Sequence, residues 1–148
     1  MVGQLDLFAG KRRRRRKPKP ALEFALHCMI ADDCKRFLNP AWRYTHLPLG
    51  EHRDHRIDKY GRRWSPAGAR LKRMGVVAGF PDFLFVGPNR SVFWLELKRR
   101  GGRMSEAQAD IFAHITACGF PFLMTDTYED ARDTLIDLGI LRGIVRGA

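Results

Sequence analysis

The stretch DFLFVGPNRSVFWLELK, residues 82–98, decides the fold of this chain. Its two apolar runs, 82–86 and 92–98, are rich in the aromatic and aliphatic residues that suit a packed sheet. The residues between them, GPNRS, are typical of a turn, so the stretch predicts a β-hairpin. Glu96 and Lys98 interrupt the second run, and charge inside a packed strand is costly unless each group has a partner or a metal.

The register of this hairpin predicts a meeting of charges. A hairpin that is symmetric about Asn89 places Asp82 opposite Glu96, with Lys98 on the same face as Glu96. Opposed carboxylates repel each other unless a cation lies between them, and Mg²⁺ takes such ligands together with substrate phosphate. An ammonium beside the ion would orient a water or stabilise developing negative charge, which predicts metal-assisted phosphodiester hydrolysis. The alternative is an ordinary edge-strand ion pair between Glu96 and Lys98.

The patterns around the hairpin predict an α/β fold with a mixed sheet flanked by helices, in the order αβββαβα. Before the hairpin we expect a helix over 21–38, a strand within 42–49, a loop over 50–70 and a short helix over 69–75. After it we expect a helix over 105–119 with Ser105 as N-cap, a strand over 120–125 and a helix over 126–139. The expected apolar stripe of the first helix comprises Leu22, Leu26, Met29 and Ile30.

The formal charge of +11 is unevenly distributed along the chain. Residues 1–20 carry +7 and residues 35–73 carry +8, whereas residues 74–148 carry −1. This pattern favours a polyanion partner such as nucleic acid over a general solubilising surplus. We expect 1–20 to be a disordered basic tail and 21–148 to be one domain. The candidate phosphate-binding residues are Arg53, Arg56, Lys59, Arg62, Arg63, Arg70, Lys72 and Arg73.

The composition also bears on the setting of the protein. Three cysteines make no dense disulfide framework, which favours a reducing, cytoplasmic environment. No apolar run approaches the roughly 18 residues of a membrane span, and the N-terminus is basic rather than a secretory signal. His52 and His55 have ligand-like spacing, but no cysteine pair lies nearby in the sequence, which argues against zinc.

Pro81-Asp82 followed by Glu96-x-Lys98 resembles the PD-(D/E)xK nuclease superfamily. The wider stretch 71–119 resembles the VRR-NUC (virus-type replication-repair nuclease) family. The residues that match the family's pattern are Gly79, Pro81, Asp82, Glu96, Leu97, Lys98, Gly102, Ser105 and Gln108. The resemblance implies a restriction-endonuclease-like core in 21–148, DNA cleavage, and Mg²⁺ or Mn²⁺ as cofactor.

The same resemblance implies roles for individual residues. Asp82, Glu96 and the backbone carbonyl of Leu97 are the expected metal ligands. Lys98 is expected to assist the attacking water, and Gln108 and Glu23 are the other expected catalytic residues. Two of these roles have alternatives, since Gln108 also completes a capping box with Ser105, and Glu23 with His27 would also make a solvated helix face.

His46 lies where relatives often carry a histidine before Pro-Asn-Gly. Here Pro48, Leu49 and Gly50 follow instead, so no asparagine is present. The sequence therefore assigns no role to His46, and a packed strand histidine is the alternative.

Near the N-terminus, QLDLF resembles the peptides with which bacterial replication and repair proteins bind the sliding clamp. The resemblance implies clamp contacts from Gln4, Leu5, Leu7 and Phe8, and a bacterial or phage source. Taken together, we expect a Mg²⁺-dependent endodeoxyribonuclease acting as a homodimer on branched DNA, such as four-way (Holliday) junctions or flaps, in replication, recombination or repair. The alternatives are a catalytically silent DNA-binding or clamp-docking accessory and a duplex-cutting restriction or mismatch-type endonuclease.

Overall fold

The computed structural model describes residues 22–49 and 56–143. None of the helices in these two ranges combines the length and the apolar character needed to cross a membrane. In chain order the elements are α1 (Leu22–Phe37), β1 (Arg43–His46), β2 (Arg56–Ile57), β3 (Arg63–Trp64), α2 (Pro66–Arg73), β4 (Phe83–Val86), β5 (Val92–Leu97), α3 (Glu106–Ala117), β6 (Phe122–Thr125) and α4 (Tyr128–Asp137).

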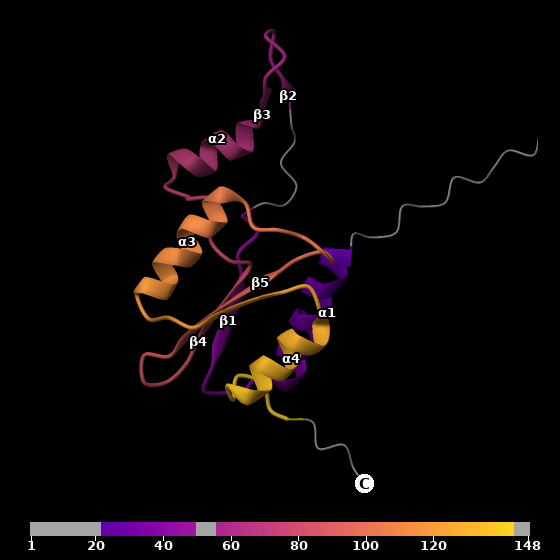
Figure 1. Ribbon diagram of the computed structural model, residues 1–148, viewed down its shortest axis with the longest axis vertical. Coiled ribbons are helices and arrows are strands. Elements are labelled where there is room, and N and C mark those ends of the chain that lie inside the picture. The colour runs from indigo at the N-terminus through magenta and orange to yellow at the C-terminus, as the bar shows by residue number, and fades with distance from the viewer. Residues whose placement is uncertain (1–21, 50–55, 144–148) are drawn as a thin grey trace, which may run out of the picture.

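Four strands form one mixed sheet in the order β1-β4-β5-β6 (Figure 1). The pairs β1–β4 and β4–β5 are antiparallel, and β5–β6 is parallel, with α3 in the connection between the last two strands. The predicted hairpin register is confirmed, because Val86 pairs with Val92 and Leu84 pairs with Trp94. The predicted mixed α/β sheet and its central hairpin are therefore confirmed.

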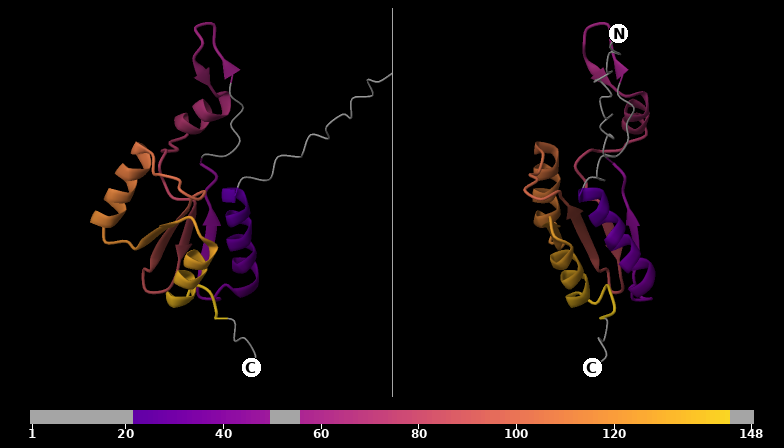
Figure 2. Two further views of the ribbon diagram at one scale, coloured as in Figure 1. Left: turned by 45° about the vertical axis from the view of Figure 1, so that its right-hand side comes forward. Right: turned by 90° about the vertical axis from the view of Figure 1, so that its right-hand side faces the viewer.

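The main core lies on one face of this sheet. Because side chains alternate along a strand, Phe83, Phe85 and Leu95 point to the same face, where residues of α1 and α4 pack against them. On the opposite face, Phe122 of β6 packs against Phe112 of α3, with their ring centroids 4.4 Å apart. Figures 1 and 2 show α1 and α4 side by side and α3 apart from them.

The buried stripe of α1 differs from the predicted one. Met29 is 44% exposed, whereas His27, Ile30 and Cys34 are buried. Positions 27, 30 and 34 are three and four residues apart, so they lie on one helix face, adjacent to the predicted stripe. Of the predicted residues, Ile30 is fully buried and Leu26 packs at the edge of the core.

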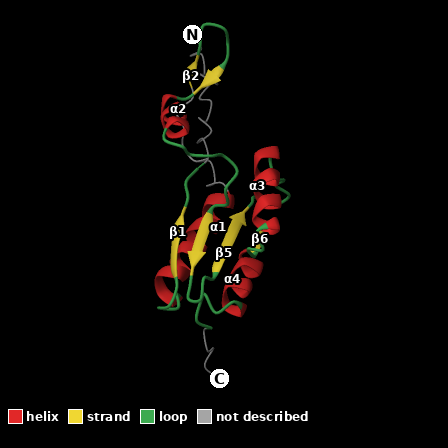
Figure 3. Ribbon diagram, turned by 90° about the vertical axis from the view of Figure 1, so that its left-hand side faces the viewer, coloured by secondary structure: helices red, strands yellow, loops and turns green. Residues whose placement is uncertain are grey.

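The strands β2 and β3 with α2 form an arm that projects beyond one end of the main sheet (Figures 1 and 3). The predicted loop over 50–70 is therefore wrong from Arg56 onward, and α2 begins at Pro66 rather than at residue 69. The early start has a local cause, since the Ser65 hydroxyl accepts a hydrogen bond from Gly68 N and proline suits the first helical turn. The ribbon residues themselves are exposed, so they carry no apolar alternation that would predict strands.

Candidate active site

The hairpin brings Asp82 and Glu96 together, as its register predicted. Asp82 immediately precedes β4, Glu96 lies in β5, both line one cavity, and the charge of Asp82 raises the pKa of Glu96. The backbone N–H of Leu97 donates a hydrogen bond of 2.9 Å to Asp82 Oδ2, which fixes this carboxylate at the end of the sheet. The two acids therefore form one site, on the face of the sheet that α3 covers.

Glu96 is 1% exposed, and its environment disfavours an isolated negative charge. Burial raises the pKa of Glu96, contact with Lys98 opposes that effect, and the neighbouring charge of Asp82 adds to it. One oxygen, Oε2, is buried and receives no hydrogen bond from any donor within residues 22–49 and 56–143. A buried carboxylate oxygen without a donor is a site that a cation would satisfy.

The pKa of Asp82 shifts in the opposite direction to that of Glu96. Burial would raise its pKa, but hydrogen bonds from the His27 ring and Leu97 N outweigh burial and lower the pKa of Asp82 below its ordinary value. Asp82 is therefore a charged carboxylate beside an acid that resists ionisation. A divalent cation between the two would favour the ionised form of both.

Lys98 and Gln108 contact the same oxygen of the buried glutamate. The Lys98 ammonium forms an ion pair with Glu96 Oε1, and the Gln108 side-chain amide donates to that oxygen. Lys98 Nζ also donates to Gln108 Oε1 at 3.0 Å. These contacts place Lys98 on the same face as Glu96, as predicted, and they hold its ammonium in a partly buried position.

Gln108 also makes the capping box that the sequence predicted. The Ser105 hydroxyl accepts from Gln108 N at 3.3 Å, and Gln108 Oε1 accepts from Ser105 N at 3.0 Å. The two alternatives for Gln108 therefore coexist, because one side chain both caps α3 and contacts Lys98 and Glu96.

Glu23 of α1 reaches the same region. Its Oε2 accepts a hydrogen bond of 3.1 Å from Arg99 N, one residue beyond Lys98. Glu23, Asp82, Glu96, Lys98 and Gln108 all line one cavity of about 320 Å³. The structure thus collects every side chain that the sequence named for metal binding or catalysis, while the roles themselves stay predictions. The carbonyl of Leu97 stays a predicted ligand as well.

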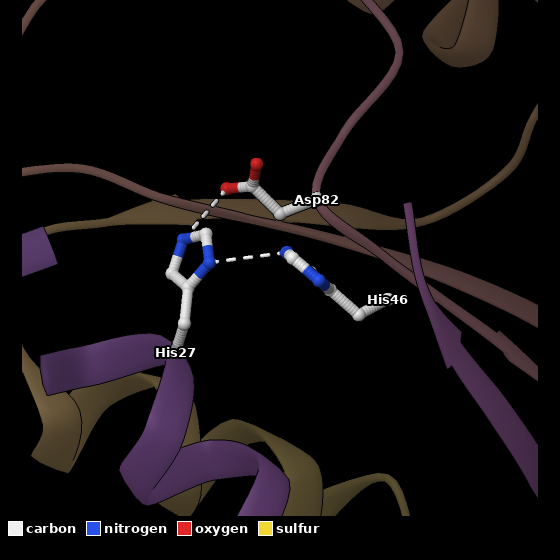
Figure 4. A group of neighbouring side chains, drawn as sticks. All are labelled: His27, His46 and Asp82. Atoms are coloured by element: carbon white, nitrogen blue, oxygen red, sulfur yellow. Dashed lines mark hydrogen bonds and ion pairs between the residues drawn. The ribbon is translucent and has the colours of Figure 1, made fainter. Parts of the chain in front are cut away.

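Two histidines that the sequence did not assign adjoin this site (Figure 4). His27 Nε2 lies 3.3 Å from Asp82 Oδ2, and His27 Nδ1 lies 3.1 Å from His46 Nε2. The alternative of a solvated face for His27 is wrong, because the residue is 7% exposed. His46 packs on Phe83 with ring centroids 4.9 Å apart, as a strand histidine would. Their proximity depends on the packing of α1 against the sheet, which the local sequence does not report.

The predicted phosphate-binding residues lie on the arm. All of those within the described part of the chain are exposed: Arg56, Lys59, Arg62, Arg63, Arg70, Lys72 and Arg73. Arg62 forms an ion pair with Asp58 at 3.0 Å, so part of its charge is already compensated. A larger cavity, of about 840 Å³, lies between α2 and residues 75–78 and contains none of the predicted catalytic residues. Arg53 and the clamp-peptide residues Gln4–Phe8 lie outside the described residues.

Apart from the arm, the order α1-β1-β4-β5-α3-β6-α4 is the predicted αβββαβα order. This order and the mixed four-stranded sheet define a restriction-endonuclease-like α/β fold.

Comparisons with known proteins give the fold a more specific relationship. A solved structure described as a "VRR_NUC domain protein" is 18% identical to the chain, with a TM-score of 0.56, and the match covers 84% of this chain and 95% of that one. Another, described as a "VRR_NUC domain", is 13% identical with a TM-score of 0.49, and the match covers 80% and 97%. No family model and no curated protein matches the sequence. The chain therefore has a VRR-NUC-like fold, as its sequence predicted.

Proposed function

We propose that the protein is a metal-dependent endodeoxyribonuclease that hydrolyses DNA phosphodiester bonds. The observation that carries the proposal is the meeting of Asp82 and Glu96 in one cavity, with Glu96 Oε2 buried and lacking a donor among the described residues. Two neighbouring acids, one of them buried, destabilise a fold unless a cation or a proton compensates them. Lys98 contacts only one oxygen of Glu96, which leaves the other available to an ion.

The donor set fits a hard divalent cation. Asp82, Glu96 and the carbonyl of Leu97 would hold Mg²⁺ or Mn²⁺, both of which accept carboxylate and carbonyl oxygens and retain positions for water and phosphate. A bound ion would supply Lewis acidity toward a phosphodiester. The chain itself supplies the ligands from one rigid hairpin, which limits the reorganisation needed to bind the ion.

The other site residues would stabilise developing negative charge or hold neighbouring groups in position. Lys98 would stabilise negative charge that develops on the phosphate or on the attacking water, because its ammonium is partly buried beside the carboxylates. Gln108 would position that ammonium through the hydrogen bond to Lys98 Nζ. Glu23 would act from α1, where it lines the same cavity and already fixes the backbone that follows Lys98.

The arm suggests how the DNA is held. Its exposed lysines and arginines stand beyond the end of the sheet at which β4 begins and β5 ends, which is the end that carries the acids. A duplex or branched DNA gripped there would lie across the cavity, and its phosphates would neutralise the excess positive charge. We propose branched DNA, such as four-way junctions or flaps, as the preferred substrate, with replication, recombination or repair as the setting.

Two further proposals concern assembly and location. Cutting two strands requires two active sites, so we propose a homodimer whose subunits each contribute one. We also propose that Gln4–Phe8 bind a bacterial sliding clamp, with the basic segment behind them held over DNA in a bacterial or phage-infected cytoplasm. The clamp proposal depends on the resemblance of QLDLF to clamp-binding peptides.

The first prediction concerns the acids and the lysine. Asp82→Ala and Lys98→Ala should each reduce cleavage of a labelled four-way junction by at least about 100-fold in Mg²⁺ or Mn²⁺, since each removes a group from the reacting centre. Binding to the junction should persist, because the arm is unchanged. Asp137→Asn is the matched control, since this carboxylate is exposed at the end of α4.

The same assay separates the rival functions. Wild-type protein that binds junctions but cuts no DNA in either metal would support the silent accessory instead. Equal cleavage of a linear duplex and a junction of the same sequence would favour the restriction or mismatch-type enzyme. A panel of single-stranded, duplex, flap and four-way substrates therefore tests both the reaction and the substrate preference.

A further inference from the structure

We infer that His27, His46 and Asp82 form a second divalent-cation site, which shares Asp82 with the Asp82–Glu96 site and prefers a transition-metal ion to Mg²⁺. One ring nitrogen of each histidine and one oxygen of Asp82 all lie within 4.8 Å of one another. The inference rests on the proposed function to the extent that Asp82 serves both sites.

The spacing of the three groups suits one ion. Donors about 2.1 Å from a metal are about 3 Å apart when adjacent and about 4.2 Å apart when opposite. The contact of 3.3 Å with Asp82 Oδ2 uses His27 Nε2, whereas the contact of 3.1 Å with His46 Nε2 uses His27 Nδ1, so one of these two pairs at a time has the adjacent spacing around an ion (Figure 4). Rotation of the imidazole rings would bring one nitrogen of each histidine and the Asp82 oxygen, already within 4.8 Å of one another, onto a shared ion.

The three groups come from separate elements that the core holds in place. His27 lies on α1 between the core and the cavity, on the same helix face as the buried Ile30 and Cys34. His46 ends β1, where it pairs with Phe83, and Leu47 N donates to the carbonyl of Asp82 at 2.7 Å. Such anchoring preorganises the donors, which a metal site needs in order to select its ion.

The chemistry of the donors determines the class of ion. Imidazole nitrogen is a borderline ligand that transition ions accept more readily than Mg²⁺ does, and two imidazoles with one carboxylate form a common triad for such ions. Asp82 and Glu96 line the same cavity, and a carboxylate can bridge two ions about 3.5–4 Å apart. His27, His46, Asp82 and Glu96 line the same cavity of about 320 Å³, so an ion has both space and access.

Mn²⁺ is the probe for the test, because it is paramagnetic and its coupling to ligand nitrogen is measurable. The full chain should bind two Mn²⁺ ions per copy by isothermal titration. Electron spin-echo modulation should show ¹⁴N coupling from imidazole. Mg²⁺ should displace the Mn²⁺ ion held by the two histidines at least tenfold less effectively than the Mn²⁺ ion held by Glu96.

Variants assign each ion to its ligands. The double variant His27→Ala/His46→Ala should bind one Mn²⁺ and lose the ¹⁴N coupling, whereas Glu96→Gln should bind one and retain it. His114→Ala is the matched control, because this histidine is exposed on α3, where its ring lies 3.6 Å from Cys118 Sγ, and it does not line the cavity. Thermal unfolding of each variant checks that the fold is intact. The ¹⁴N coupling in the wild-type spectrum tests the site in a protein that carries no substitution.

Two results would overturn the inference. Wild-type protein that binds a single Mn²⁺ without nitrogen coupling has no imidazole site, and nuclease activity in that protein would leave the proposed function standing. Loss of both ions in Glu96→Gln would show one indivisible site rather than two. Conversely, nitrogen-coupled Mn²⁺ in a protein that cuts no DNA would support the second site and contradict the proposed function.

Discussion

Gly79 shows how a residue without a side chain positions the site. Its φ of +101° is a conformation that other residues avoid, and a Cβ there would lie 2.3 Å from the backbone carbonyl oxygen of Ala107. The loop that leads to Asp82 therefore runs directly against the first turn of α3, which carries Gln108. The Gly-x-Pro-Asp pattern of the sequence has a physical basis in this close approach.

We expect Gly79→Ala to separate the loop from α3. The substitution should lower the free energy of unfolding by roughly 2–4 kcal/mol, since it combines an unfavourable φ with a backbone clash. Chemical denaturation measures the change. Gly75→Ala is the control, because its φ of +90° is close to that of Gly79 while no atom lies within 4 Å of the added Cβ. Equal losses in the two variants would rule out the clash.

The arm differs from the main sheet and its helices in that its helix buries no side chain and carries clustered positive charge. The helix α2 has no buried residue, and three basic residues lie in its last turn: Arg70, Lys72 and Arg73. An element that buries little apolar surface contributes little to folding. The arm therefore adds little to the stability of the fold, and its positive charge favours phosphate binding.

Replacing Arg70, Lys72 and Arg73 together by alanine should weaken DNA binding without affecting the fold. The slope of log affinity against log salt should fall by roughly 0.9 for each DNA phosphate that the variant no longer neutralises. Fluorescence anisotropy at several salt concentrations gives the slope. A control that removes the same charge from Lys35, Arg36 and Arg142, which are exposed near the end of α1, should leave the slope nearly unchanged. Equal effects of the two triple variants would show a contribution of net charge alone.

Two polar contacts to Asp33 link α1 and α4, the first and last helices of the described residues. The Tyr128 hydroxyl of α4 donates to Asp33 Oδ2 of α1 at 2.6 Å, and Arg132 Nε lies 3.6 Å from the same oxygen. Burial, together with this hydrogen bond, raises the pKa of Tyr128 to about 12. The neutral phenol therefore belongs to the folded state, since ionisation would place two negative charges together.

This contact predicts a pH dependence of stability at alkaline pH. Because the folded pKa exceeds the ordinary value of 10, the stabilisation is fully present below pH 10 and is lost as pH rises toward 12. Tyr128→Phe should cost about 1.5 kcal/mol at neutral pH, and its difference from wild type should shrink over that window. Denaturation between pH 8 and about 12 measures it. Tyr60→Phe, on the exposed ribbon, should behave as wild type; parallel profiles for wild type and Tyr128→Phe would contradict the prediction.

The sequence predicted those parts of the molecule that local pattern determines. The hairpin and its register followed from two apolar runs and one turn, and they sufficed to place Asp82, Glu96 and Lys98 together. The start of α3 followed from the capping box. These features depend on residues close in the sequence or on a hairpin register that assumes symmetry about the turn, which the structure confirms.

Features that depend on distant packing were missed. His27 is buried because α1 packs on the sheet, and nothing in its helical neighbours distinguishes it from a solvated residue. The strands β2 and β3 are two residues long and exposed, so alternation gives no signal. Met29 is exposed because the buried face of α1 lies one position away from its most apolar stripe. The errors in α1 concern which face meets the core rather than whether the helix forms.

The double use of Gln108 links local folding to reactivity. The amide that completes the first turn of α3 is also the amide that contacts Lys98 and Glu96. Fraying of that single turn would release the ammonium and the buried carboxylate at once, without disturbing the strands. A substitution that shifts where α3 begins would therefore disturb these buried groups, even though Ser105 and its neighbours lie at the surface.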